Sequence, residues 1–276
     1  MFHVNKKIIT GIITAGLICC AYLTACEDKS KGSITSDPAT PNQSAAHTAH
    51  FTFVEHGQDT PSTLEAKDKD ILYISASAEK AAFVAENRID RPIAKKINDV
   101  LTQAYERSKN LYNSMIDDLD VYLSSEDSSD MSVFPWESSA DFTCLRNDSK
   151  AISISETIES KSAGALVNTT VYTYNFDPST GDQIQQPFYA TDDKADFDKA
   201  DDQMYTKLVD KYGKDVISYK NVASSFVEVA SKCWYFTESG VHVAFNAGSI
   251  ASEEAGILEI DYTKEELPEL AQKYFD

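Results

Sequence analysis

The sequence predicts an α+β fold: an antiparallel sheet of meanders and hairpins packed against a long amphipathic helix and one or two further helices. Three observations support this class. Apolar residues recur at helical spacing over residues 93–119, alternate with polar residues over 140–176, and return as a hairpin around Gly240. Because helices and strands do not alternate strictly along the chain, α+β is favoured over a parallel α/β sheet.

The first 25 residues predict an export signal, not part of the fold. Lys6 and Lys7 precede an apolar run over residues 8–25, which ends in Leu23-Thr-Ala-Cys26. A basic start, an apolar middle and small residues before a cysteine are typical of a signal peptide. The Leu-x-x-Cys ending resembles a bacterial lipobox, which implies that Cys26 is lipidated and becomes the first mature residue.

The alternative is a plain N-terminal transmembrane anchor, since a run of about eighteen residues is near the minimum for a span. Glu27 and Asp28 follow the run directly, whereas a membrane span is usually flanked by Lys or Arg. We therefore expect a lipoprotein of the bacterial cell envelope, anchored to a membrane and facing away from the cytoplasm. Two acyl chains on one cysteine suffice for stable anchoring.

Residues 26–69 predict a flexible tether, and residues 70–276 predict one folded domain. The segment from Lys29 to His50 is rich in Ser, Thr, Pro, Ala and Asn and has almost no large apolar residue. Such a segment cannot bury enough surface to offset the entropy lost on ordering. The region after residue 70 is long enough, and apolar enough, to bury a core.

The elements of this domain are expected in a definite order. Short strands at 71–74 and 83–84 precede a long helix, whose start at Pro92 suits the first helical turn. Residues 140–176 follow as strands, and a turn at 177–181 leads to a second helix at 192–212, capped by Gly213. The hairpin at 233–245 is expected to turn at Gly240 with a positive φ, and a strand at 258–262 leads into a terminal helix.

The charge of the chain limits its partners. The formal net charge is −19, and removing residues 1–25, which carry two lysines and no acids, leaves −21. A charge this negative disfavours nucleic acid and anionic lipid surfaces and speeds the encounter with cationic partners. The alternative is that the acidity serves solubility alone.

Two cysteines, Cys144 and Cys233, remain after the signal peptide is removed and Cys26 is lipidated. An exported compartment permits a disulfide between them, but sequence does not show whether they are within reach of each other. The alternative is that both are small buried apolar residues.

The remaining candidates for a metal, catalytic or binding site lack the motifs that such sites require. His47, His50 and His56 fit no closed metal-site spacing, and the aspartates between Asp192 and Asp202 lack the pattern of a calcium loop, so no metal or cofactor is expected. His242 lacks a recognisable nucleophile motif around it, and no catalytic residue is expected. Trp136 is either a core aromatic residue or an exposed binding anchor.

Three stretches resemble a known family. They are Ser162–Ala165 with Tyr174–Gly181, then Trp234–Phe245, then Ile250–Tyr262; Ile97-Asn98 matches a pair in the family's helix. The family is the extracytoplasmic domain shared by RsiV-type anti-sigma proteins and PdaC-type peptidoglycan deacetylases, and the likeness covers about residues 70–275. One departure is Leu166, where the family often has histidine.

The resemblance implies a non-catalytic ligand-binding domain, because the paired-histidine site of the deacetylases has no counterpart here. The outer domain of RsiV-type proteins binds lysozyme, a very basic protein, so a cationic muramidase is the first expected partner and peptidoglycan the second. The alternative from another class is an enzyme acting on cell-wall glycan, with carboxylates that the sequence does not locate.

Overall fold

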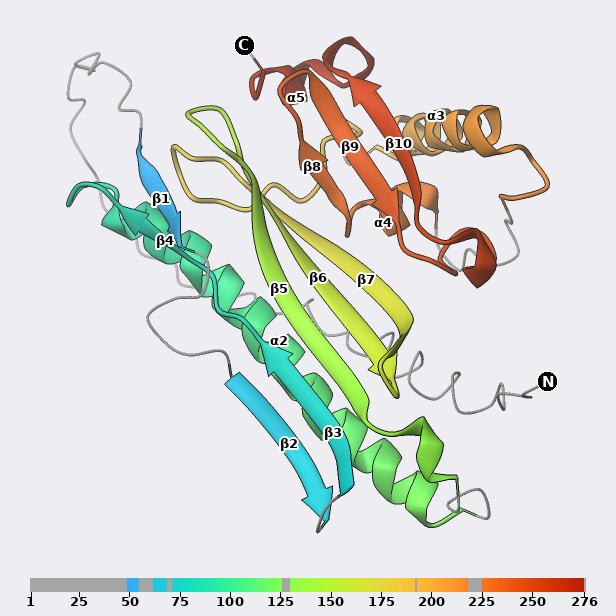
Figure 1. Ribbon diagram of the computed structural model, residues 1–276. Helices are drawn as coiled ribbons and strands as arrows, with labels where there is room; N and C mark the ends of the chain where they lie inside the picture. The colour runs from blue at the N-terminus through green and yellow to red at the C-terminus, as the bar shows by residue number, and fades with distance from the viewer. Residues whose placement is uncertain are drawn as a thin grey trace, which may run out of the picture. The chain divides into compact units, whose positions relative to one another are not determined.

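Figure 1 shows the computed structural model, which describes residues 49–54, 62–68, 71–125, 130–191, 193–217 and 225–275. The predicted signal peptide and Cys26 lie outside these residues, as do His47, His56 and Asp192. The predicted α+β class is confirmed. No helix within the described ranges combines the length and apolarity needed to cross a membrane.

The strands are β1 (Phe51–Val54), β2 (Ser62–Asp68), β3 (Ile71–Ala78), β4 (Ala82–Ala85), β5 (Trp136–Asn147), β6 (Ile152–Ser162), β7 (Ala165–Phe176), β8 (Trp234–Phe236), β9 (Gly240–Phe245) and β10 (Leu258–Thr263). The α-helices are α2 (Arg91–Leu123), α3 (Lys194–Tyr212), α4 (Phe226–Ala230) and α5 (Glu269–Gln272). Single 3₁₀ turns form η3 (Met131–Val133), η5 (Glu253–Ala255) and η6 (Lys264–Glu266).

The strands form three sheets. The largest has the order β2-β3-β5-β6-β7, in which β3 and β5 are parallel and every other neighbour is antiparallel. The predicted meander is therefore confirmed in β5, β6 and β7, and the parallel pair is an addition to it. The second sheet has the order β10-β9-β8, and β1 pairs with β4.

The long helix α2 and the meander enclose the first core. Helical spacing places Ile97, Leu101 and Ala104 on one face of α2, where all three are buried against Phe142, Ile154 and other side chains of the sheet. Asn98 joins this helix to β4: its amide bonds to both the N–H and the carbonyl oxygen of Phe83, at 2.7 and 2.9 Å. Asn98 thus supplies the strand with hydrogen bonds that a neighbouring strand would otherwise make.

The expected boundary between tether and domain, at residue 70, is wrong. Strands β1 and β2 both lie inside the range expected to be a tether, and the compact unit begins at Ala49. Phe51 is buried beside Phe83, and β2 pairs with β3 along its whole length. The misjudged segments are short strands with few large apolar residues, which carry a weak strand pattern.

The second core lies around β8, β9, β10 and α3. Its largest fully buried side chains include Trp234, Phe226 and Phe236. Polar contacts join it to the meander: the hydroxyl oxygen of Thr173 accepts a bond from the Trp234 N–H at 2.7 Å, and that of Ser153 accepts one from the Phe236 N–H at 3.2 Å. The second sheet is thus fixed against the ends of β6 and β7.

The turn at 177–181 and the hairpin at 233–245 were predicted correctly, but the role assigned to Gly240 was wrong. Gly181 has a φ of 72° and closes its turn on Asp177. Gly240 is not among the residues with positive φ; instead, a Cβ added there would lie 1.8 Å from the backbone oxygen of Tyr262. Glycine is required at residue 240 because β9 and β10 approach closely.

Candidate functional site

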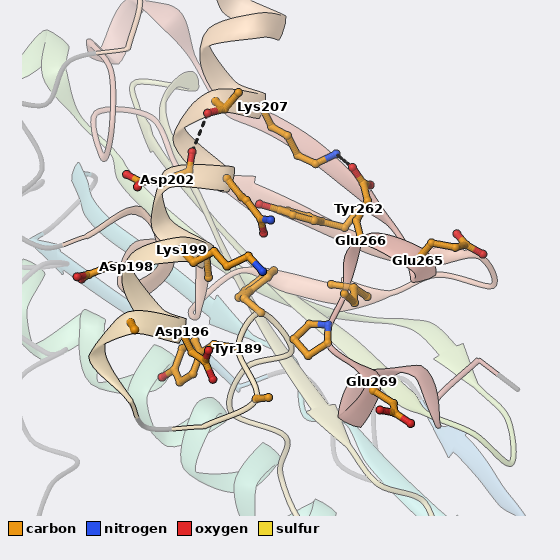
Figure 2. A pocket seen from close by; sticks show the side chains of 18 residues that line it. Tyr189, Asp196, Asp198, Lys199, Asp202, Lys207, Tyr262, Glu265, Glu266 and Glu269 are labelled. Atoms are coloured by element: carbon orange, nitrogen blue, oxygen red, sulfur yellow. Dashed lines mark hydrogen bonds and ion pairs between the residues drawn. The ribbon is translucent and has the colours of Figure 1, made fainter.

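A hollow lies between α3 and the segment that follows β10 (Figure 2). We call it the groove; its volume is about 1050 Å³. Its lining residues are Phe188, Tyr189, Ala190, Ala195, Asp196, Asp198, Lys199, Ala200, Asp202, Gln203, Thr206, Lys207, Tyr262, Glu265, Glu266, Leu267, Pro268 and Glu269.

Helix α3 forms one wall of the groove. The carboxylate of Asp193 caps its first turn by accepting a bond from the Ala195 N–H at 3.2 Å, and Gly213, with a φ of 87°, ends it. Its apolar stripe of Ala200, Met204 and Leu208 is buried in the second core. Lys199, Gln203 and Lys207, four residues apart, share another face and line the groove.

The floor of the groove carries a buried hydroxyl with no partner. Tyr262 is 5% exposed, and no described residue gives its hydroxyl oxygen a hydrogen bond. Burial, together with the carboxylates of Glu266 and Asp201, raises the pKa of Tyr262, so the hydroxyl keeps its proton at neutral pH. A buried hydroxyl without a partner is costly, and because its oxygen has almost no accessible surface it is closed to a ligand in the groove.

The opposite wall is the 3₁₀ turn η6, followed by Leu267 and Pro268. Glu266 closes a capping box with Thr263 and forms an ion pair with Lys207 at 2.7 Å. Glu265 and Glu269 line the same side, and neither has an ion-pair partner among the described residues. The terminal helix expected after the strand at 258–262 forms as two short pieces, η6 and α5, which Leu267 and Pro268 separate.

The positions of the charged groups decide what the groove can bind. Figure 2 shows Lys199 extending from α3 towards the opposite wall, whereas Asp198 and Asp202 point away from the interior. Asp198 is neutralised by Lys194 at 2.6 Å. Lys199 has no ion-pair partner in the described part of the chain. The carboxylates of Glu265 and Glu269 also point outward (Figure 2), so Lys199 is the unpaired charged group that extends between the walls.

A second surface feature lies at the C-terminal end of α2. Five exposed apolar side chains lie on elements that meet at this end, and we call them the terminal surface: Ile71, Val121, Leu123, Met131 and Leu166. The same elements carry an aromatic cluster in which Tyr73 and Tyr122 both pack on Phe134, with ring centroids 5.1 and 5.4 Å apart. The turn between β6 and β7 reaches the same end, since the Ala163 N–H donates to the Pro135 oxygen at 2.8 Å.

Carboxylates are interleaved with the terminal surface. Asp117 precedes Val121 by four residues and Asp120 precedes Leu123 by three, so each acid shares a helix face with an apolar residue. No described base pairs with Asp117 or Asp120, and the last turn of α2 contains no base. Carboxylates at a helix C-terminus add to the negative end of the helix dipole, so the site attracts cations.

Several predicted site residues have structural roles. Cys144 and Cys233 are not bridged to each other: Cys144 lies on the meander beside the Arg146 carbonyl oxygen, and Cys233 is buried just before β8. Trp136 is a core residue, not an exposed anchor. His242 is a half-buried strand residue whose Nδ1 lies 2.8 Å from an oxygen of Asp261.

The aspartates of α3 serve mostly in local contacts. Asp201 accepts a bond from the Val227 N–H at 3.0 Å and so orients α4, while Asp196 accepts a bond from the Thr191 hydroxyl at 2.7 Å. Over the described ranges, no three His, Cys, Asp or Glu residues are grouped so that they could hold a metal ion.

A buried charged cluster between α2 and the meander could not be found from the sequence. Glu156 on β6 is fully buried and accepts hydrogen bonds from Arg107, Ser108 and Tyr174. The guanidinium of Arg107 also lies over the ring of Tyr172, 4.4 Å from its centroid. Arg107 and Ser108 lie 49 and 48 positions before Glu156, and Tyr174 lies 18 positions after it. The only signal in the sequence is that Glu156 occupies an inward position of β6, in alternation with serine and threonine.

Comparison with known proteins identifies the fold. A DUF3298-family protein of Bacteroides fragilis aligns with a TM-score of 0.56 and 12% identity, over 82% of this chain and 98% of that chain. One from Pseudomonas aeruginosa PAO1 aligns with a TM-score of 0.52 and 11% identity, over 83% and 98%. No family model and no curated protein matches the sequence. At these identities the likeness shows a shared fold and says nothing of function.

Proposed function

We propose that this chain is a lipid-anchored, non-catalytic binding protein of the bacterial cell envelope, related to the outer domain of RsiV-type and PdaC-type proteins. We further propose that its partner is a cationic muramidase of the lysozyme type, bound at the terminal surface. The shared DUF3298-type fold is compatible with this relationship. The lipobox-like Leu23–Cys26 supports the anchor.

The observation that carries the proposal is the combination of apolar and acidic side chains at the end of α2. Val121 is 72% exposed, on the same helix face as an unpaired Asp117. Exposed apolar groups beside the unpaired carboxylates of Asp117 and Asp120 suit a basic protein, because the charges speed and orient the encounter while the apolar groups add affinity. The mature net charge of −21 acts in the same direction at longer range.

The family resemblance points to the same end of the domain. Leu166 stands where related proteins often have histidine, and it is 58% exposed at the start of β7. An apolar residue here extends the terminal surface instead of adding a charge to it. The departure from the family pattern therefore favours contact with an apolar part of the partner at this position.

The test compares two matched substitutions of exposed apolar residues. Val121→Ser removes an apolar contact from the terminal surface, and Ile89→Ser, at a residue 73% exposed before the start of α2, is the control. Binding of a basic lysozyme to the purified protein is measured by surface plasmon resonance. We expect Val121→Ser to weaken binding about tenfold, or about 1.4 kcal/mol, and Ile89→Ser to leave it unchanged; equal effects would contradict the proposal.

A further inference from the structure

The loop between β4 and α2 is not explained by the proposed muramidase, which would bind at the other end of α2. This loop comprises residues 86–90 and leads into Arg91, the first residue of the helix. We propose that it docks on anionic phospholipid at the surface of the membrane that holds the anchor: Ile89 inserts among the headgroups, and Arg88 and Arg91 bind their phosphates. This proposal rests on the proposed lipid anchor at Cys26, but not on binding of a muramidase.

The side chain of Ile89 is the first observation. It is 73% exposed, more than any other large apolar side chain in the described part of the chain. Val84, on the strand that leads into the loop, is 54% exposed. Exposed apolar side chains a few positions apart are typical of a surface that contacts a protein or a membrane. An apolar residue buried at the headgroup level of a bilayer regains the free energy that its exposure to water costs.

Hydrogen bonds within the loop hold Ile89 in its exposed position. The side-chain oxygen of Asn87 accepts bonds from the N–H of Ile89 at 2.9 Å and of Asp90 at 3.1 Å. The Asn87 amide nitrogen donates in turn to the Asp90 carboxylate at 2.6 Å. Asp90 is fully buried, so its charge does not reach the surface of the loop. A loop that is ordered in advance loses little entropy when it inserts.

Arg88 and Arg91 supply positive charge on either side of Ile89. Both side chains are exposed, and neither forms an ion pair with any described residue. The first turn of α2 contains no acid, and the positive end of its helix dipole adds to the charge of Arg91. A guanidinium group forms paired hydrogen bonds with phosphate, and each basic residue at an anionic membrane surface favours binding by about fivefold.

The charges next to the loop leave it positive. Lys95 pairs with Asp99 at 2.6 Å. Lys96 pairs with Asp182 at 2.8 Å, so all four of these charges cancel. Glu86 is the one exposed acid within the loop, against two unpaired guanidinium groups. The net charge of the mature chain repels anionic lipid, but at physiological salt charges more than about 8 Å away are screened, so this local excess decides the contact.

The chain enters the folded domain beside this loop. The His50 N–H donates to the Asp90 carboxylate at 3.4 Å, and the His50 oxygen accepts a bond from the Glu86 N–H at 3.2 Å. Residues 27–48 precede Ala49, where the compact unit begins, and even fully extended they keep the loop within roughly 80 Å of an anchored lipid. Anchoring raises the effective concentration of the membrane at the loop, so a weak contact suffices. Docking here leaves the terminal surface, at the other end of α2, free for its partner (Figure 1).

The test places the purified protein, with its N-terminal anchor, in vesicles of phosphatidylcholine alone or of equal parts phosphatidylcholine and phosphatidylglycerol. Hydrogen exchange of the backbone amides of residues 86–91 is then followed by mass spectrometry at physiological salt. We expect exchange to be about tenfold slower or more on the anionic vesicles, because two arginines together favour that surface by more than about tenfold. Exchange at residues 118–123, in the last turns of α2, should not change. Equal exchange of the loop on both vesicles would overturn the proposal.

Two double variants separate the loop from a general effect of charge. Arg88→Gln with Arg91→Gln should abolish the difference between the vesicles. The melting temperature should stay the same, because both side chains are exposed and neither forms an ion pair with a described residue. Lys199→Gln with Lys214→Gln makes the same charge change at exposed residues of α3 and just after it, and should keep the difference. An equal loss in the lysine pair would overturn the assignment to the loop.

Ile89→Ser tests the insertion of the apolar side chain. It should reduce the slowing on anionic vesicles several-fold, whereas Val121→Ser should not; an equal effect of both would overturn the insertion. Slower exchange of the loop when inorganic phosphate is added to the neutral vesicles would mean a site for soluble anions, and would also overturn the proposal. Flotation of the protein with neutral vesicles tests the anchor, and binding of lysozyme tests the proposed function, so each failure is distinguishable from failure of the loop to dock.

Discussion

The side-chain amide of Asn175, at the end of β7, donates a hydrogen bond to the backbone oxygen of Trp234 on β8, 2.6 Å away. Both residues are almost completely buried, and the Asn175 amide oxygen accepts a further bond from Ser153 at 2.6 Å. This contact lies between the two cores. The Asn-Phe-Asp segment that resembles a family signature thus serves to dock the second sheet on the meander.

Asn175→Ala should therefore destabilise the whole domain. It leaves the Trp234 carbonyl and the Ser153 hydroxyl buried with fewer partners, at an expected loss of about 2–3 kcal/mol in the free energy of unfolding. Urea unfolding followed by tryptophan fluorescence measures it. Asn168→Ala, on the same strand but bonded only to the Thr170 hydroxyl at 3.3 Å, is the control and should change little. Similar losses in both variants would contradict the docking role.

Glu156→Gln should destabilise the protein by about 3 kcal/mol or more, because it leaves the half-buried Arg107 without its counter-charge. Glu159→Gln, in a more exposed pair with Lys161 on the same strand, should cost less than about 1 kcal/mol. The two variants are compared by the urea concentration at the midpoint of unfolding. If Glu156→Gln behaved like Glu159→Gln, the buried cluster would be dispensable for stability.

Stability should fall at alkaline pH partly through Cys233. Burial raises the pKa of this thiol from its ordinary value of 9.0 to about 12. Between these values the unfolded chain releases the proton and the folded chain retains it, so stability is full below pH 9 and declines as pH rises towards 12. Cys233→Ala should show a smaller decline in urea midpoint over this interval; an identical pH profile in both proteins would refute the assignment.

Gly240→Ala should be far more disruptive than Gly164→Ala. An added Cβ at residue 240 meets the Tyr262 backbone oxygen at 1.8 Å, so β9 and β10 would have to separate. Gly164, with a φ of 79°, has no atom within 4 Å of an added Cβ, and its substitution costs only backbone strain of about 1–2 kcal/mol. Thermal melting separates the two. Comparable melting temperatures would mean that the strands can adjust around the methyl group.

The sequence predicted those features that depend on local periodicity. The stripe through Ile97 and Leu101 predicted α2, and the alternation around Ile152 and Ile154 predicted the meander, because burial of one face imposes that spacing. Strand β2 was missed because its sequence, Ser62–Asp68, is polar at most positions, and it forms the edge of the sheet beside β3. Whether such a polar segment forms a strand depends on its pairing with a neighbouring strand, which its own sequence does not show.

The candidate site could not be predicted from local sequence patterns. Lys199 and Tyr262 are far apart in the chain and line the same groove only because α3 packs beside β10. The position of η6 beside α3, which brings Glu265 and Glu269 to the lining of the groove, depends on tertiary packing. The terminal surface likewise joins Ile71 to Leu123 and Leu166, which no periodicity connects.

The most direct test of the proposed function is the affinity of the purified protein for a basic lysozyme across a series of salt concentrations, with muramidase activity assayed in parallel. We expect submicromolar binding that survives about 0.15 M salt, where exposed charges are screened beyond about 8 Å. We also expect Asp117→Asn with Asp120→Asn to weaken binding more than the matched pair Asp210→Asn with Asp215→Asn. Binding seen only at low salt, or no binding at all, would mean that lysozyme is not the partner.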